Sequence, residues 1–387
     1  MKAKLHVSKP NRYASKRGPV CAALVVVLSL GVSASHAQTI PFDSERWQID
    51  ARESRVETYK GRQSLYLKGG VAWITDDEFT NGIVEFDVAF SGARGFMGGL
   101  WRMQDRRNYE EFYMRPHQSG NPDANQYTPV INGLSGWQLY HGPGYGMPVA
   151  YTFDQWMHVK IVFAGSQGEV FIDSEEPVLV MHELKHPVAP GKVGLSAGNF
   201  APAYFSNFSY QKIDQPALQG TPPVPESAPV GTIMAWSVSN AFDEASLADK
   251  VELSDADKAG LTWTTLAAEA TGITNLSHRA SLGQEANTVF ARVVIESERA
   301  QVKQVRFGYS DRVKVYANGR LLYSGSNQFL SRDYRYLGTI GLFDAVAVPL
   351  ASGTNELWFA VSESFGGWGL LGVIDDREGI SILDLGF

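Results

Sequence analysis

A short stretch of the chain places ionisable and aromatic side chains at every second position. In residues 109–117 the odd-numbered positions carry these ionisable or aromatic side chains. Of the even-numbered positions between them, 112 and 114 carry the apolar Phe112 and Met114, and Glu110 lies at the edge of this apolar face. A period of two is typical of a β-strand with one buried face. The opposite face would then carry Tyr109, Glu111, Tyr113, Arg115 and His117. These groups could stack on an apolar ring and exchange hydrogen bonds at its rim.

The surrounding segment, from 108 to 146, adds further aromatic and amide groups. A saccharide has apolar C–H faces that stack on Tyr or Trp, and hydroxyls that need planar donors and acceptors. We therefore expect a saccharide site here, with residues 120–136 forming a wall or cover. A plain surface loop is the alternative interpretation. The further residues expected to contact the ligand are Gln126, Tyr127, Asn132, Trp137 and Tyr140.

A second strand pattern offers two carboxylates. Residues 82–90 alternate apolar side chains with Glu85 and Asp87, which would lie about 7 Å apart along a strand. Glycoside hydrolysis uses carboxyl pairs about 5 to 9.5 Å apart, so these two residues are candidates for the acid and base if their sheet surface also carries the polar face. A solvated strand face is the alternative.

Two other groups of side chains suggest different chemistry. His117, with Tyr113 and Arg115, could neutralise a uronate and move a proton in a β-elimination, although a backbone-capping role for His117 is equally open. Arg102 belongs to a local basic cluster that an anionic glycan could contact. No histidine pair has zinc-site spacing, and we expect no cofactor, although the acids at 76–78 could help to bind a structural calcium ion.

The first 37 residues have the composition of an export signal. Met1 to Arg17 is basic without an acid, residues 20–32 are almost wholly apolar, and small residues precede position 38. The apolar run is too short for a permanent membrane span, and no later segment is long enough. We therefore expect an exported protein, periplasmic or extracellular. Cys21 is the only cysteine, so no disulfide is expected after cleavage.

Charge and length limit the partners and the architecture. Without the signal, 28 Lys and Arg face 41 Asp and Glu, a net charge of about −13, which excludes nucleic acid as a favoured partner. The remaining 350 residues suit two domains. Residues 214–230 hold five prolines and read as a linker between a 38–213 domain and a 231–387 domain. Oligomeric state is left open.

Strand patterns dominate both predicted domains. In the first, 96–103 with 109–115 and 156–163 with 168–173 predict two hairpins. In the second, Asn318-Gly319 predicts a tight turn between strands, and strands are expected at 302–309, 312–316, 356–361 and 380–385. The fold class is therefore all-β, with two β-sandwich domains.

Several motifs of the first domain resemble the concanavalin A-like lectin and glucanase superfamily, especially its laminin G-like and 3-keto-disaccharide hydrolase-like members. They are Asp76 to Val88, Gly99-Leu100-Trp101-Arg102, Asn108-Tyr109, Trp156 to Ile161 and Gly191 to Leu195. The resemblance covers about residues 40–212 and implies a two-sheet jelly roll. Glucanases of this superfamily carry three acids on one strand. Here Val88, Ala89 and Phe90 follow Asp87, so the third acid is missing.

The second domain resembles the galactose-binding-like jelly rolls of many glycoside hydrolases. The motifs are 307–311, 315–319, 353–357 and Phe365-Gly366-Gly367-Trp368-Gly369. The resemblance implies sugar-binding loops in some members, with Trp368 as a stacking platform or a packing residue. We expect an exported protein that binds a poly- or oligosaccharide. A glycoside hydrolase or polysaccharide lyase, and an architectural surface protein that binds no sugar, are the alternatives.

Overall fold

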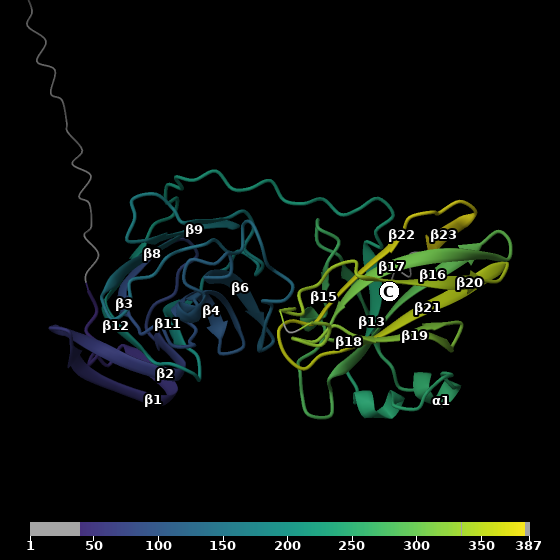
Figure 1. Ribbon diagram of the computed structural model, residues 1–387, viewed down its shortest axis with the longest axis horizontal. Coiled ribbons are helices and arrows are strands. Elements are labelled where there is room, and N and C mark those ends of the chain that lie inside the picture. The colour runs from purple at the N-terminus through teal and green to yellow at the C-terminus, as the bar shows by residue number, and fades with distance from the viewer. Residues whose placement is uncertain (1–38, 334, 384–387) are drawn as a thin grey trace, which may run out of the picture. The chain divides into compact units, whose positions relative to one another are not determined.

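The computed structural model describes residues 39–333 and 335–383. The expected export signal therefore lies outside the described residues. These described residues belong to one compact unit. Its secondary structure is almost wholly β, with three sheets of 12, 7 and 4 strands, so the all-β sandwich prediction is confirmed (Figure 1). In the described part of the chain, no helix is long and apolar enough to cross a membrane.

The 12-stranded sheet belongs to the amino-terminal sandwich and is antiparallel throughout. Its path runs β10-β9-β8-β3-β12-β2-β11-β4-β5-β6-β7, and β1 pairs with β2. The strands are β1 (Trp47–Tyr59), β2 (Arg62–Ile74), β3 (Gly82–Ala89), β4 (Met97–Asp105), β5 (Asn108–Met114), β6 (Asn125–Ile131), β7 (Leu134–Ser135), β8 (Met157–Ala164), β9 (Gln167–Ile172), β10 (Leu179–Met181), β11 (Lys192–Ala197) and β12 (Ala203–Lys212).

Strand β2 connects the two halves of this curled sheet. Its residues 65–67 pair with β12, whereas residues 70–73 pair with β11. Between them Gly69 has a φ of +70°, and a Cβ there would lie 2.5 Å from Asn199 Oδ1. A side chain would be strained and crowded at this bend, which explains why glycine stands there.

The core lies between the two halves of the sheet. Val84, Phe86 and Val88 of β3 and Phe112 and Met114 of β5 belong to the same buried cluster. The alternation expected for both strands is thus confirmed, and so are both predicted hairpins, β4–β5 and β8–β9. The side chains between these positions point away from the core, on the outer faces of the sheet.

The carboxy-terminal sandwich has a 7-stranded and a 4-stranded sheet. The first follows β14-β13-β16-β21-β18-β19, with β23 paired to β16, and the second follows β15-β22-β17-β20. The strands are β13 (Ala235–Ser239), β14 (Trp263–Ala267), β15 (Thr274–Asn275), β16 (Thr288–Ser297), β17 (Gln301–Ser310), β18 (Arg312–Ala317), β19 (Arg320–Ser326), β20 (Asp344–Leu350), β21 (Gly353–Ser362), β22 (Gly369–Ile374) and β23 (Ile380–Leu383).

Apolar side chains from both of these sheets form a second buried cluster that includes Trp236, Phe307, Phe359 and Trp368. The predicted Asn-Gly turn joins β18 to β19, and both of its residues have positive φ, 49° at Asn318 and 81° at Gly319. Residues 214–230 contain no strand or helix. The short helical elements are η1 (Pro116–Gln118), η2 (Glu244–Leu247), α1 (Asp255–Lys258) and η3 (Leu276–His278).

Candidate functional site

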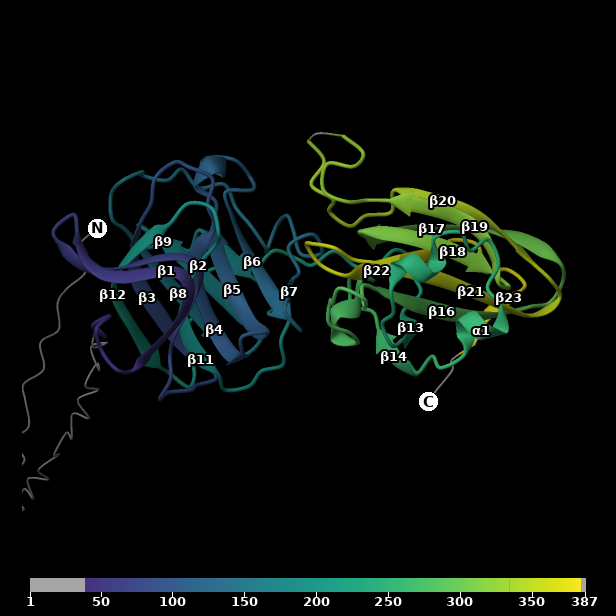
Figure 2. The same cartoon turned by 90° about the horizontal axis from the view of Figure 1, so that it is seen from below.

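A pocket of about 590 Å³ opens over the outer face of β5 and β11. Strand β5 lies between β4 and β6 in the sheet (Figure 2). The predicted polar face lines this pocket, since Tyr109, Glu111, Tyr113, Arg115 and His117 are all among its wall residues, and so is Trp137. The predicted polar face of β5 therefore coincides with a pocket in the described part of the chain.

Aromatic rings form two sides of the pocket. On one side, the ring centroid of Phe96 lies 5.8 Å from that of Phe200 and 5.9 Å from that of Tyr113. On the other side, Trp137 lies 5.6 Å from Phe365 and 6.3 Å from Phe329. Trp137 is half-buried, whereas Phe365 is 62% and Phe200 is 54% exposed. Exposed rings that face a cavity provide apolar surfaces on which a ring-shaped ligand can stack.

Arg115 organises the floor of the pocket. Its guanidinium donates to the hydroxyl of Tyr113 over 2.8 Å, to Asp123 Oδ1 over 2.5 Å and to the side-chain oxygen of Gln126. Gln126 in turn donates to the carbonyl oxygens of Trp137 and Tyr140. Arg115 is only 4% exposed. It therefore acts first as a support for Tyr113 and for the Trp137 backbone.

Glu111 brings a carboxyl group to the same pocket. No described residue forms an ion pair with it, and Tyr109 and Tyr113 flank it on β5. Burial raises the pKa of Glu111, and the neighbouring Ser196 hydroxyl only partly opposes this shift. A carboxyl group held in an aromatic pocket without a cation can accept a hydrogen bond or, when protonated, donate one.

One end of the pocket is electropositive. Arg94 and His117 both line it, and burial together with the charges of Arg94 and Arg115 lowers the pKa of His117. The His117 ring meets Phe96 edge-on, with 5.5 Å between ring centroids. Its Nδ1 atom is buried and has no hydrogen-bond partner among the described residues. The imidazole is therefore neutral at pH 7 and available to a ligand that brings negative charge.

Loops of the carboxy-terminal sandwich complete the pocket with Phe329, Leu337 and Phe365. The buried Gln138 joins them to the β7 region. Its backbone N–H donates to the carbonyl of Gly366 over 2.8 Å, and its carbonyl accepts from the N–H of Ile340 over 2.9 Å. Its side chain donates to the Leu337 carbonyl over 2.9 Å and accepts from the Ser310 hydroxyl over 3.1 Å.

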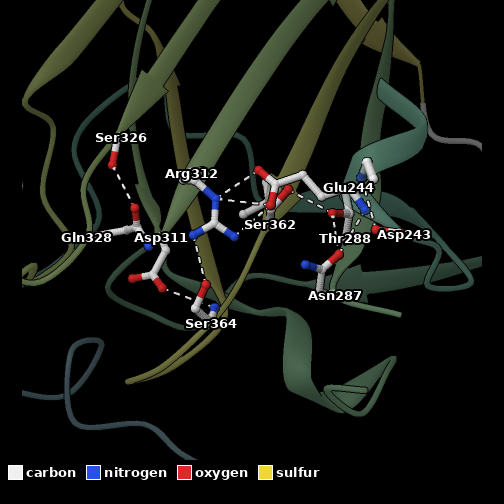
Figure 3. Close-up of polar contacts among 12 residues, drawn as sticks. Asp243, Glu244, Asn287, Thr288, Asp311, Arg312, Ser326, Gln328, Ser362 and Ser364 are labelled. Atoms are coloured by element: carbon white, nitrogen blue, oxygen red, sulfur yellow. Dashed lines mark hydrogen bonds and ion pairs between the residues drawn. The ribbon is translucent and has the colours of Figure 1, made fainter. Parts of the chain in front are cut away.

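A second anchor holds the loop that carries Phe365. Asp311 Oδ2 accepts hydrogen bonds from the backbone N–H groups of Ser364 and Phe365, at 3.0 and 3.2 Å. Next to it, Arg312 forms an ion pair with Glu244 and donates to the hydroxyl of Ser364 over 2.8 Å (Figure 3). The loop is therefore fixed from two directions, by Gln138 and by Asp311.

The same ion pair explains why a smaller cavity is a weaker candidate site. A pocket of about 340 Å³ over β18 and β19 is lined by Glu244, Arg312 and Lys314. Glu244 and Arg312 neutralise each other, and Lys314 Nζ donates to the backbone carbonyls of Leu247 and Ala248. The charged groups that line this smaller pocket therefore already have partners within the protein.

Glu85 and Asp87 do not belong to the large pocket. Four strands separate β3 from β5 along the sheet path, and neither carboxylate lines the cavity. Asp87 instead accepts hydrogen bonds from Arg62, from Asn207 over 2.6 Å and from His158 Nδ1 over 2.9 Å. The expected pairing of these acids with the β5 face is therefore corrected, because the curled sheet turns the outer face of β3 away from that of β5.

The Asp87 cluster is a surface ion-pair network. Burial alone would raise the pKa of Asp87, but the hydrogen bonds from His158 and Asn207 lower it overall. The hydrogen bond with Asp87, and then the contact with Glu85, raise the pKa of His158 to about 9. His158 is therefore protonated at neutral pH, and both Asp87 oxygens are already bonded.

Several other residues expected to contact a ligand are buried inside the protein. Arg102 is 1% exposed and donates to the carbonyls of Thr80 and Gly165. Trp368, expected as an exposed platform or a packing residue, is fully buried, and its indole N–H donates to the carbonyl of Val361. Packing, which periodicity does not specify, decides both placements.

Tyr127, Tyr140 and Asn132 also lie outside the pocket. Tyr127 is fully buried and donates to Glu110 over 2.8 Å. Tyr140, 1% exposed, donates to Glu269, and Asn132 donates to the carbonyl of Ser277 over 2.7 Å. The latter two contacts join loops of the amino-terminal sandwich to the carboxy-terminal sandwich. Gln126 is 3% exposed and supports the floor from beneath.

Pocket residues that the sequence patterns did not indicate include Arg94, Phe96, Phe200, Phe329 and Phe365. Phe365 stands in the 365–369 motif, in which Trp368, flanked by glycines, was the expected stacking residue. Phe200 is 54% exposed within a turn-rich stretch, which was a usable signal. Arg94 and Phe96 lie just before β4, and no local pattern distinguished them.

The acids at 76–78 each face a cation. Asp76 pairs with Arg46 over 2.9 Å, Asp77 with Lys212, and Glu78 with Lys192 over 4.0 Å. Within the described residues, no group of three or more His, Cys, Asp or Glu side chains is arranged to hold a metal ion. A calcium ion at this loop stays a prediction.

No family model matches the chain, and no curated protein matches it. Among solved structures it is similar to a carbohydrate binding module from Bacillus subtilis, with 14% identity over 43% of this chain and 96% of the module, at a TM-score of 0.33. It is similar to a β-glucanase from Bacillus licheniformis, with 12% identity over 46% and 98% of the two chains, at a TM-score of 0.31. It is also similar to the exoplasmic/lumenal domain of VIP36, with 13% identity over 48% and 91%, at a TM-score of 0.33.

Proposed function

We propose that the chain binds a poly- or oligosaccharide in the pocket over β5 and β11. The observation that supports this most directly is the combination, in one cavity of about 590 Å³, of exposed aromatic rings with carboxyl, guanidinium, imidazole and phenol groups. A pocket of this volume suits a small ligand or a short stretch of a polymer. Trp137 and Phe365 on one side and Phe96 and Phe200 on the other would stack on sugar rings, while Glu111 and Tyr109 would meet hydroxyls.

Isothermal titration calorimetry of the mature protein against a panel of soluble polysaccharides tests this proposal. Trp137→Ala removes the indole next to Phe365 and should weaken binding about tenfold, on the order of 1.4 kcal/mol. Trp156→Ala is the matched control, because Trp156 is also partly buried but stands beside Arg62, outside the pocket. Wild-type affinity in Trp137→Ala, or equal losses in both variants, would contradict the proposal.

A second candidate function is cleavage of the bound saccharide. Glu111 favours it, because an unpaired carboxyl group whose pKa is raised by burial resembles the general acid of a glycoside hydrolase. Asp123 lies in the same pocket, and burial raises its pKa as well, against the opposing charge of Arg115. New reducing ends or unsaturated products from the wild type, absent with Glu111→Gln at unchanged binding, would establish cleavage. Product release that persists in Glu111→Gln would exclude this role for Glu111.

Export remains part of the proposal. The basic, then apolar, then small-residue order of positions 1–37 supports cleavage near residue 37 and delivery to the periplasm or the exterior. Sequencing the amino terminus of the protein recovered from the periplasm or the medium of a bacterial host tests it. Recovery of an uncleaved chain in the cytosol alone would contradict it.

A further inference from the structure

Three arginines line the pocket, and they differ in what neutralises them. Arg106 forms an ion pair with Asp50, and Arg115 forms one with Asp123 over 2.5 Å. Arg94 has neither a carboxylate nor a hydrogen-bond acceptor among the described residues. Its guanidinium carbon instead lies 4.7 Å from the ring centroid of Phe200 and 6.0 Å from that of Phe96. One guanidinium at the pocket is thus positioned by aromatic stacking, with its donors free.

His117 adds a second unmatched group at the same end. It lines the pocket against Phe96, and its buried Nδ1 atom has no hydrogen-bond partner among the described residues. Burial, and then the positive charges of Arg94 and Arg115, lower the pKa of His117, so both arginines act on this ring as positive neighbours. A carboxylate placed beside His117 and Arg94 would reverse that effect.

The acidic groups of the pocket do not cancel this positive charge. Asp123 is bonded through Oδ1 to the guanidinium of Arg115. Glu111, on β5, is held towards its neutral form by burial. The chain as a whole has a formal net charge of −7, so the positive end of the pocket is a local feature and not part of a basic surface.

We propose that the saccharide recognised by this pocket carries a carboxylate, as a uronic acid unit does, and that Arg94 and His117 bind it. A guanidinium binds a carboxylate through two parallel hydrogen bonds, and the aromatic platform of Phe200 leaves the donor edges of Arg94 available. A neutral sugar would offer neither group a charged partner, whereas a carboxylate could also approach the buried Nδ1 atom of His117, which has no hydrogen-bond partner among the described residues. This inference rests on saccharide binding at the pocket and narrows the class of ligand.

Binding of a carboxylate should also be linked to protonation of His117. The anion favours the imidazolium form, so binding takes up a proton and strengthens as the pH falls from 7.5 to 5.5. Over this range a uronate remains ionised. A carboxyl-free sugar has no such coupling, and its affinity should depend little on His117.

The experiment compares polygalacturonate and alginate oligosaccharides with their carboxyl-reduced forms, which keep the linkage and lose the charge. Calorimetry at pH 5.5 and 7.5 should show at least one acid form binding at least tenfold more tightly than its reduced form, with the larger difference at pH 5.5. Arg94→Gln should remove most of that preference and keep the binding of the reduced form. His117→Gln should abolish the pH dependence.

Arg299→Gln is the charge control, because Arg299 is exposed, pairs with Glu378 and lies outside the pocket. It should behave as the wild type. Reduced or neutral saccharides that bind as tightly as the acid forms would overturn the carboxylate inference and leave saccharide binding intact. Binding of sulfated polymers without uronates would also overturn it. Failure of the folded protein to bind any saccharide would contradict the proposed function as well.

Discussion

The side-chain amide of Gln138 donates a hydrogen bond to the carbonyl oxygen of Leu337 over 2.9 Å, across 199 residues of sequence. Gln138 is fully buried, and its other polar atoms bond to Ser310, Ile340 and Gly366. One glutamine therefore sets the position of the two loops that bring Leu337 and Phe365 to the pocket. The shape of the pocket therefore depends on these contacts as well as on the strands that line it.

We predict that Gln138→Leu destabilises the protein and weakens ligand binding together. The substitution removes both side-chain hydrogen bonds and leaves the buried Ser310 hydroxyl without a partner, a loss of about 2 kcal/mol. Urea unfolding measures the stability, and calorimetry measures the affinity. Gln48→Leu on β1, where the glutamine is exposed, should change neither quantity. An unaltered affinity in Gln138→Leu would show that the loops keep their positions without it.

Substitution of Arg115 by methionine should lower the free energy of unfolding, whereas the same substitution of Arg94 should leave it nearly unchanged. Arg115→Met leaves Asp123 without its cation and the side-chain oxygen of Gln126 without its donor, and we expect a loss of about 2 to 3 kcal/mol of stability, moderated because the Asp123 side chain is 38% exposed. Arg94→Met removes no such contact and should stay within about 0.5 kcal/mol of the wild type. Urea unfolding of both variants tests this, and equal losses would contradict the supporting role assigned to Arg115.

The His158–Asp87 contact predicts a decline of stability at alkaline pH. The folded-state pKa of His158 is raised to about 9, above the unfolded value of about 6.5. Its contribution is therefore complete below about pH 6.5 and is lost as the pH rises through 9. The His158 side chain is 51% exposed, so solvent screening keeps the effect modest. Unfolding free energies between pH 6 and 10 should fall less steeply in His158→Gln, and parallel profiles would refute the assignment.

A buried carboxyl group in the carboxy-terminal sandwich predicts that the free energy of unfolding also depends on pH between about 4.3 and 8. Burial, and then the charge of Asp311, raise the pKa of Glu363 to about 8, whereas the unfolded value is about 4.3. The folded state thus holds a proton that the unfolded chain releases, and stability falls as the pH rises from about 4.3 to 8. Glu363→Gln, neutral and similar in shape, should flatten this slope in urea unfolding at pH 5, 6.5 and 8. An undiminished slope would count against Glu363 as its source.

The strands and their faces followed from local pattern. Alternation located the buried face of β3 and the pocket face of β5, and the Asn-Gly pair located the β18–β19 turn, because side-chain direction and positive φ are properties of a few consecutive residues. Composition was a poorer guide to exposure. Tyr127 and Trp368 are core residues, since aromatic rings fill cores as readily as they line binding sites.

The sequence by itself determined an all-β chain, the strand that lines the pocket and the kinds of groups on it. Only the tertiary structure decided which side chains share that cavity. The turn of the curled sheet separated Glu85 and Asp87 from Glu111, and the contacts of Gln138 and Asp311 brought Phe365 to Trp137 across more than 220 residues. The physical reason is that the alternation of side chains along one strand is a local property, whereas the curvature of a sheet and the docking of distant loops depend on packing summed over the whole molecule.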